Sequence, residues 1–157
     1  MIQRLEYKEG QLAEYRERLK LLPTDQTSYS RLANKELRER ATNLVANVRQ
    51  FLRQWSEQDL VSMFSQQAAM SGAKTEEERN RVWQNQTKDM MLKSSRRNAE
   101  YDKRFKVETI VLRDELLSRL PTESKNEHAY SMYEHPTNPI GMGMVADDLE
   151  RLAKLLP

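Results

Sequence analysis

The stretch SGAKTEEE, residues 71–78, decides how this sequence folds, because helical patterns lie on both sides of it. Ser71 and Gly72 end the pattern that comes before. Thr75 and Glu78 have the spacing of a capping box, and the three glutamates fall in a first turn, where the helix dipole favours acids. Because such a short connection joins antiparallel neighbours, the sequence predicts a helical hairpin that turns near Gly72.

The helix before the turn is predicted over about residues 30–70, from apolar residues at every third or fourth position. The members of this stripe are Leu37, Ala41, Leu44, Val48, Leu52 and Trp55. At Ser56 the pattern changes phase, and Ser56 with Asp59 again has capping-box spacing. We therefore expect a kink or a break near residue 56.

The helix after the turn is predicted over residues 76–120, since neither proline nor glycine occurs before Pro121. At 1.5 Å per residue this helix is roughly 68 Å long, whereas a compact domain of this size is only ~30 Å across. An elongated molecule follows.

Two shorter helices are predicted at the ends of the chain, over residues 2–22 and 143–156, with an irregular loop at 121–142. The expected fold class is all-α: one domain over residues 1–157, an elongated antiparallel helical bundle built on a long helical hairpin, coiled-coil-like. Pairing about Gly72 places Phe64 near Trp83.

The predicted inward stripe of the second long helix is interrupted by Ser94, Ser95 and Asn98. Two interpretations are open. In the preferred interpretation, these small side chains let the two helix backbones approach closely. In the other, they form a polar layer that fixes the register of the hairpin or lines a small cavity. The same antiparallel pairing brings Trp55 near Met90 and Met91.

Apolar residues are left over on this helix at Val107, Ile110, Val111 and Leu117, off the stripe that faces the hairpin partner. A two-helix rod cannot bury both of its faces, and the short first helix covers less than half of it. The surplus therefore favours a homodimer, since two-fold pairing is the commonest arrangement.

Composition restricts the function classes. The chain has 157 residues, a net charge of +2, 32% charged residues and no cysteine, which excludes thiolate metal sites and cysteine nucleophiles. Neither a signal peptide nor an apolar run of ~20 residues is recognised, so we expect a soluble, cytoplasmic protein. The sequence contains no motif that would predict a metal site, a catalytic residue or a cofactor.

Cations gather on both arms of the predicted hairpin. Residues 92–106 carry six cations against two acids, and residues 40–53 carry three arginines and no acid, whereas residues 121–157 have a net charge of −3. The basic band comprises Arg40, Arg49, Arg53, Lys93, Arg96, Arg97, Lys103 and Arg104. Three interpretations remain: a solvated face, a docking site for the acidic last helix, or a site for phosphates, acidic lipids or an acidic protein.

The loop at 128–143 is the second candidate site, because it contains both histidines of the chain. His128, Tyr133, Glu134 and His135 are the candidate residues. The spacing between the histidines is not typical of a zinc site, and a loop that wraps the end of the bundle is the simpler interpretation.

These patterns predict a non-enzymatic, self-associating helical interaction module, such as an adaptor, scaffold or regulatory domain, with the basic band directed to an acidic partner. The first alternative is an anion-binding module for nucleic acid or membrane headgroups. The second alternative is a small metal-dependent or ligand-binding protein that uses the 128–143 loop.

Overall fold

The computed structural model describes residues 29–134 and 136–157, and these residues form helices and connections without strands. The all-α prediction is confirmed. The helix predicted over residues 2–22 lies outside the described residues.

Five α-helices and three short helical turns follow one another along the described chain. The α-helices are α3 (Asn34–Gly72), α4 (Glu76–Tyr101), α5 (Val107–Ser118), α6 (Glu127–Glu134) and α7 (Pro139–Leu155). The short turns are the 3-10 helices η1 (Tyr29–Arg31) and η3 (Thr122–Ser124) and the π-helical turn η2 (Asp102–Lys106).

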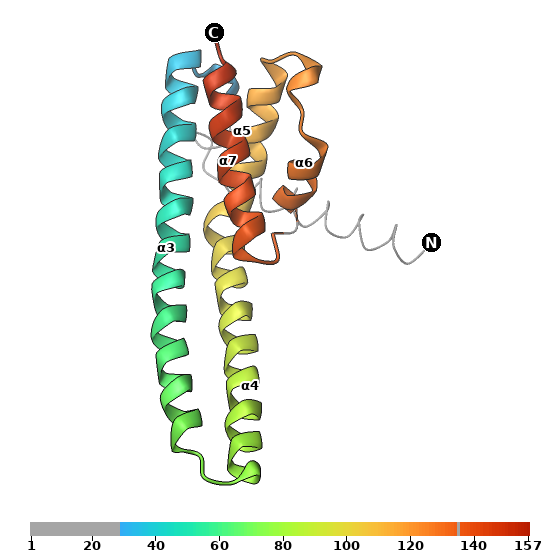
Figure 1. Ribbon diagram of the computed structural model, residues 1–157. Helices are drawn as coiled ribbons and strands as arrows, with labels where there is room; N and C mark the ends of the chain where they lie inside the picture. The colour runs from blue at the N-terminus through green and yellow to red at the C-terminus, as the bar shows by residue number, and fades with distance from the viewer. Residues whose placement is uncertain (1–28, 135) are drawn as a thin grey trace, which may run out of the picture.

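The chain folds back between α3 and α4, which run antiparallel and side by side (Figure 1). Thr75 caps α4, since its side chain accepts a hydrogen bond from the backbone N–H of Glu78 at 3.1 Å. The Glu78 carboxylate in turn accepts from the Lys74 N–H at 2.8 Å. Each partner satisfies a backbone N–H that the first turn leaves free.

Two predicted features differ from the structure, the break near Ser56 and the loop at 121–142, and a third is found. Helix α3 continues through Ser56 without a break, because a Ser in mid-helix can stay exposed and needs no cap there. The long helix predicted over 76–120 is present, since α4, the π turn η2 and α5 follow one another without a gap from Glu76 to Ser118. The predicted loop at 121–142 contains α6, and α7 begins at Pro139, where the Asn138 side chain accepts from the Gly141 N–H at 2.8 Å.

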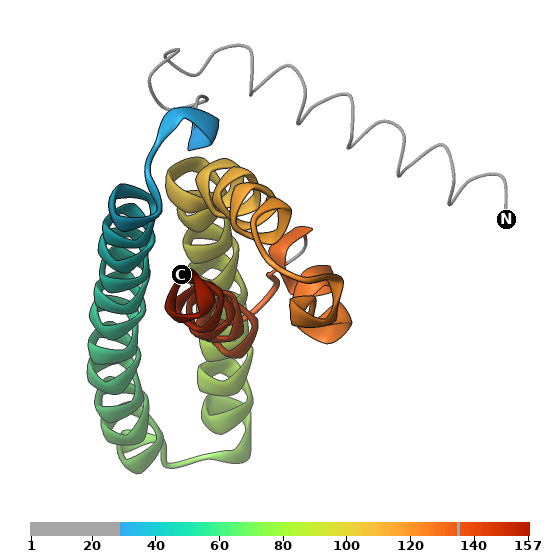
Figure 2. The ribbon, with the colours of Figure 1, turned by 90° about the horizontal axis from the view of Figure 1, so that it is seen from above.

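The hydrophobic core lies in the half of the hairpin that carries the chain's C-terminal helices. Helix α7 lies between α3 and α5, and α6 packs on α7 (Figure 2). Val145, Leu149 and Leu152 of α7 are fully buried there. On the hairpin itself, Phe51 of α3 meets Phe105 of η2 with ring centroids 5.4 Å apart.

Polar groups also fix α6 and α7 to each other and to the preceding turn. The Tyr133 hydroxyl donates to the buried carboxylate of Asp148 at 2.9 Å. Arg151 donates to the other oxygen of Asp148 at 2.8 Å and to the Ser124 carbonyl at 2.6 Å. Because each group has partners, the buried carboxylate is tolerated in the core.

The covering helices reach only part of the hairpin. Helix α3 has 39 residues and α7 has 17, or roughly 58 Å against 26 Å. The uncovered part, residues 56–94, is called the arm, and it extends beyond the N-terminal end of α7 (Figure 1). Within the described residues no helix is long and apolar enough to cross a membrane.

Replacing a core residue of α7 should destabilise the fold strongly. Leu149 is fully buried and Leu155, on the same helix, is 50% exposed. We expect Leu149→Ala to lower the free energy of unfolding by about 2–5 kcal/mol and Leu155→Ala by less than about 0.5 kcal/mol, measured by urea unfolding. Equal losses would contradict the placement of α7.

The buried tyrosines should make the fold sensitive to alkali. Burial, with the nearby Glu108, raises the pKa of Tyr29 to about 12, and burial also raises the pKa of Tyr101 and Tyr133. An unfolded tyrosine ionises near pH 10. Stability from these groups is therefore complete below about pH 10 and is lost as the pH rises toward the folded pKa values.

Tyrosinate absorbance should accordingly rise together with the loss of helical circular dichroism in an alkaline titration. Tyr29→Phe removes one contribution, so that variant should lose less stability above about pH 10. Titration of these tyrosines while the helices remain intact would contradict their burial.

Candidate interaction surface

Large apolar side chains are exposed along the arm, on both of its helices. Between 49% and 70% of each is accessible to solvent. The set comprises Leu60, Val61, Met63, Phe64, Trp83, Met90, Met91 and Leu92. Single exposed apolar residues are normal on protein surfaces, but a group of this size marks an interaction site or an aggregation liability.

The side chains between the two helices of the arm are polar instead. Gln86 of α4 donates its side-chain N–H to the Gln66 carbonyl of α3 at 3.2 Å. Nearer the bundle, the Lys93 ammonium donates to the Ser62 hydroxyl. The usual arrangement, apolar residues between helices and polar residues outside, is thus reversed in this part of the arm, whereas Met70 and Val82 near the turn are half-buried.

The register predicted for this part of the hairpin is wrong. Phe64 and Trp83 were expected to meet between the helices, but they are 69% and 63% exposed. Met91 is 70% exposed, so it does not cover Trp55. The hydrogen bonds of Gln66 and Ser62 set a different pairing, in which polar residues face each other.

Most of the exposed apolar side chains lie on one face. Leu60, Met63 and Phe64 are spaced i, i+3, i+4 along α3, so they share one side of that helix. Trp83, Met90 and Met91 are spaced i, i+7, i+8 on α4 and likewise share one side. Met63 and Met90 line the same pocket, which places the two stripes on the same side of the hairpin.

These six residues define the apolar face, and helix α7 begins where this face ends. Gly143 of α7 lies against Leu52 of α3, with a Cβ position 4.0 Å from its Cδ1. The Asn98 side chain of α4 donates to the Thr137 carbonyl, just before α7, at 3.0 Å. Leu52 and Asn98 continue the two stripes at helical spacing, eight residues from Leu60 and from Met90. The side of the hairpin that α7 covers near the core is therefore the side left open along the arm.

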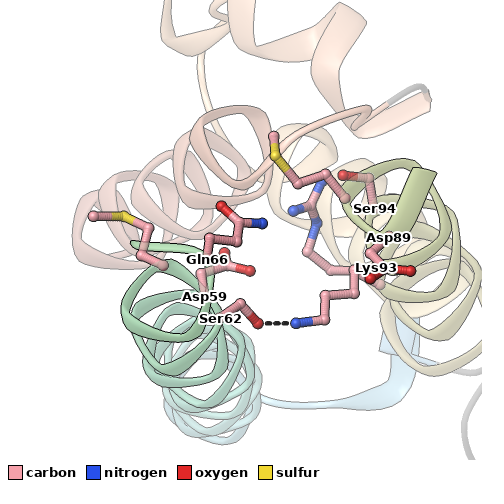
Figure 3. Close-up of a pocket in the computed structure, with 9 residues that line it drawn as sticks. Asp59, Ser62, Gln66, Asp89, Lys93 and Ser94 are labelled. Carbon is pink, nitrogen blue, oxygen red and sulfur yellow. Dashed lines mark hydrogen bonds between the residues drawn. The ribbon is translucent and has the colours of Figure 1, made fainter. Parts of the chain in front are cut away.

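A pocket of about 300 Å³ lies between the helices on this face (Figure 3). Asp59, Ser62 and Gln66 enter it from α3, and Asp89, Lys93 and Ser94 enter it from α4. Met63, Met90 and Arg97 complete the lining. Of the three residues of the predicted polar layer, Ser94 thus lines a small cavity, whereas Ser95 is exposed and Asn98 donates to the Thr137 carbonyl.

The pocket has charges of both signs. Arg97 is only 8% exposed, and its Nε donates a hydrogen bond to the side-chain oxygen of the neighbouring Asn98 at 3.3 Å. Among the described residues, neither Asp59 nor Asp89 forms an ion pair with the two cations of the pocket. Two carboxylates and two cations therefore face a shared space without neutralising each other directly.

The basic band predicted from the sequence does not form one continuous surface. Arg49 pairs with Asp147 at 2.9 Å and with Glu150, both on α7, so the acidic last helix docks on the band at this position. Both contacts raise the pKa of Arg49. The pKa of Glu150 is lowered by its hydrogen bonds with Lys154 and with Arg49.

Other members of the band have local partners or lie in the pocket. The guanidinium of Arg104 lies 4.8 Å from the Phe105 ring centre and pairs with Glu100 at 3.4 Å. Arg40 stacks over the Tyr29 ring at 5.6 Å. Lys93 and Arg97 line the pocket. The members that remain exposed, with no ion pair among the described residues, are Arg53, Arg96 and Lys103.

The loop candidate is dispersed in a similar way. Tyr133 is fully buried and its hydroxyl donates a hydrogen bond to Asp148. Glu134 is the last residue of α6. His135 and the side chain of His128 lie outside what the structure describes. In the described part of the chain, no group of three potential metal ligands comes together.

The arm was not recognised as a site from the sequence, although a signal was present. The apolar stripe of α3 that starts at Leu37 stays in phase only as far as Phe51 and Trp55, after which Ser62 and Gln66 take the inward positions. This change of phase was read as a break in the helix. Comparisons with protein-family models, with curated proteins and with solved structures found no match, so the function has to be argued from this geometry.

The Arg49 contacts predict a pH-dependent effect on stability. Arg49→Ala removes the partner of two carboxylates, so it should lower the midpoint of thermal unfolding at neutral pH. Because a carboxylate whose pKa is lowered in the fold stabilises only while it is ionised, the difference from the parent should vanish below about pH 4. Arg53→Ala, on an exposed residue of the same helix, is the control and should change little at either pH.

Proposed function

We propose that the chain is a non-enzymatic, self-associating helical interaction module in which the arm is the contact surface. The observation that supports this is the reversed polarity of the arm: large apolar side chains face water while polar groups occupy the space between its helices. An isolated hairpin gains nothing from such an arrangement, because hydrophobic burial is the main favourable term in folding. Burial of the apolar face against a partner would restore that term.

The exposed area is of the size that a specific interface requires. The six side chains of the apolar face each offer roughly 100 Å², about half of what a large apolar side chain can bury. Their sum is on the order of 600 Å² per partner, or about 1,200 Å² in total, which is the lower end of the range for specific interfaces. Aromatic residues and methionine, which recur in this set, are also enriched at the centres of interfaces.

A second copy of the chain is the proposed partner. A two-fold contact uses the same patch on both subunits. Each copy of the chain carries one apolar face, so two copies can cover each other's face. Ile140, which is 77% exposed at the start of α7, would extend the contact at the end of the arm. This proposal moves the interface away from Val107 and Ile110, on which the sequence-based argument for a dimer rested, because Ile110 packs on the core.

An adaptor, scaffold or regulatory role in the cytoplasm is consistent with such a module. Binding of an acidic partner remains part of the proposal, carried by the exposed cations Arg53, Arg96 and Lys103. The enzymatic and metal-dependent alternatives have no comparable observation in their favour, since the residues on which they depended are dispersed or outside the described part of the chain.

Charge placed on the apolar face should separate the dimer. We expect Met63→Glu and Met90→Glu each to weaken association about tenfold or more, since an apolar contact is lost and a charge would have to lose its water at the centre of the contact. The measurement is the mass of the full chain by light scattering over a range of concentrations. Circular dichroism should show unchanged helicity, because both side chains are exposed in the single chain.

Val61→Glu is the matched control. Val61 is 67% exposed and lies on the same helix as Met63, but it lines a different hollow, together with Gln54 and Glu57. This variant should associate like the parent. A parent chain that stays monomeric at all concentrations, or equal effects of the three substitutions, would refute the proposed interface.

A further inference from the structure

We infer that two copies pack arm against arm in antiparallel orientation, with the two-fold axis near Thr87, so that the glutamates at the start of α4 of each copy reach the charged pocket of the other. This inference rests on the proposed self-association and adds its geometry. Three independent features of the described residues lead to it: the position of α7, the charge along α4 and the pattern of large and small side chains around Thr87.

The position of α7 excludes the parallel arrangement on steric grounds. Helix α7 lies on the same side of the hairpin as the apolar face, and its N-terminal end meets that face at Leu52 and Asn98. The axis of α7 lies above the hairpin by about the distance between two packed helices, roughly 8–10 Å. Two copies facing each other in parallel would bring α7 onto the partner's α7 before the arms could touch.

The antiparallel arrangement has no such conflict. Each arm then lies beyond the end of the partner's α7, and its tip reaches the loop before that helix. The length fits, because the tip of the arm at Glu77 and the start of the covered region at Arg97 are each ten residues from Thr87, ~15 Å along α4. The arms can therefore overlap over their whole length, with Ile140 of each copy at the partner's tip.

The charge along α4 favours the same orientation. The start of α4 carries three glutamates, Glu76 to Glu78, balanced by Lys74, Arg79 and Arg81, whereas the other end of the uncovered segment carries Lys93, Arg96 and Arg97. A parallel pair would place the two basic segments side by side, and like charges in contact are unfavourable. An antiparallel pair places each basic segment beside the partner's glutamates and keeps the two basic segments on opposite sides of the axis.

The side chains around Thr87 complement themselves under this two-fold axis. Trp83, Thr87 and Met91 are spaced i, i+4, i+8, and they line one shallow hollow on α4. With Thr87 on the axis, Trp83 of one copy lies on the partner's Met91, and the two small Thr87 side chains face each other between these pairs. Sulfur–aromatic contacts of this kind are favourable.

The arrangement also gives the pocket an occupant. Arg97 and Lys93 line one side of it, and Arg97 is nine-tenths buried. With Thr87 on the axis, Glu77 of the partner's α4 lies at the level of Arg97, where its carboxylate can accept from the guanidinium. The partner copy thus supplies Arg97 with a carboxylate partner, which Asp59 and Asp89 of its own pocket do not provide.

Cysteine cross-linking of the full chain tests this geometry directly, because the chain has no cysteine of its own. Thr87→Cys, on the axis, should form a covalent dimer on mild oxidation or with a short bis-maleimide. Asn80→Cys and Ser94→Cys lie on either side of the axis, so neither should link to its own copy, at a separation of ~20 Å. The double variant carrying both should form dimers.

The mass of each variant before cross-linking separates the two proposals. Association with efficient linking of Asn80→Cys or of Ser94→Cys alone would show a parallel pair and overturn this inference, while self-association would stand. A monomer by mass would overturn both. Thr87→Cys combined with Met90→Glu should lose the cross-link, because the charge separates the apolar faces; a persistent cross-link would indicate random collision and overturn the inference.

Discussion

The architecture depends on the burial of α7 between α3 and α5. Its side chains Val145, Leu149 and Leu152 are fully buried, and the Arg49 contacts and the Tyr133–Asp148 hydrogen bond hold its polar side. Helix α7 can stabilise the hairpin only over the length along which it packs against α3 and α5. It has fewer than half as many residues as α3. The division of the molecule into a packed half and an open arm follows from this difference in length.

The arm is a region of low local stability in a single chain. Few buried apolar contacts join its helices, and the hydrogen bonds between them are exposed or partly buried. Such segments open more readily than a core does. A partner that covers the apolar face would therefore do more than bind: it would supply the packing that the second half of the hairpin lacks, and the arm would gain stability in proportion to the partner's concentration.

The fold was more predictable than the site. The turn at Gly72 and the cap at Thr75 are local signals that depend on neighbouring residues only, and both can be read directly. Helix α6 was missed because prolines flank it, although Ala129 and Tyr133 have helical spacing and are buried. The arm was misjudged for a different reason: apolar residues such as Trp83 are assigned to the interior by default, and only the three-dimensional extent of α7 reveals that no helix of the described chain covers them. The docking of the acidic helix at Arg49 was foreseen as an alternative from charge alone.

The π turn between α4 and α5 sets how α4 is rotated about its axis relative to α5, and this rotation depends on a single residue. Tyr101 and Phe105 are both buried across this turn, with ring centroids 5.6 Å apart. A π turn accommodates one residue more than regular helix does, and one residue corresponds to about 100° of rotation about the helix axis. A one-residue deletion within 102–106 would rotate α4 relative to α5, so that Tyr101 and Phe105 could not both stay in the core, and it would swing Trp83 and Met90 away from the side that α7 occupies. The number of residues in this turn therefore sets which side of the molecule the apolar face of the arm is on.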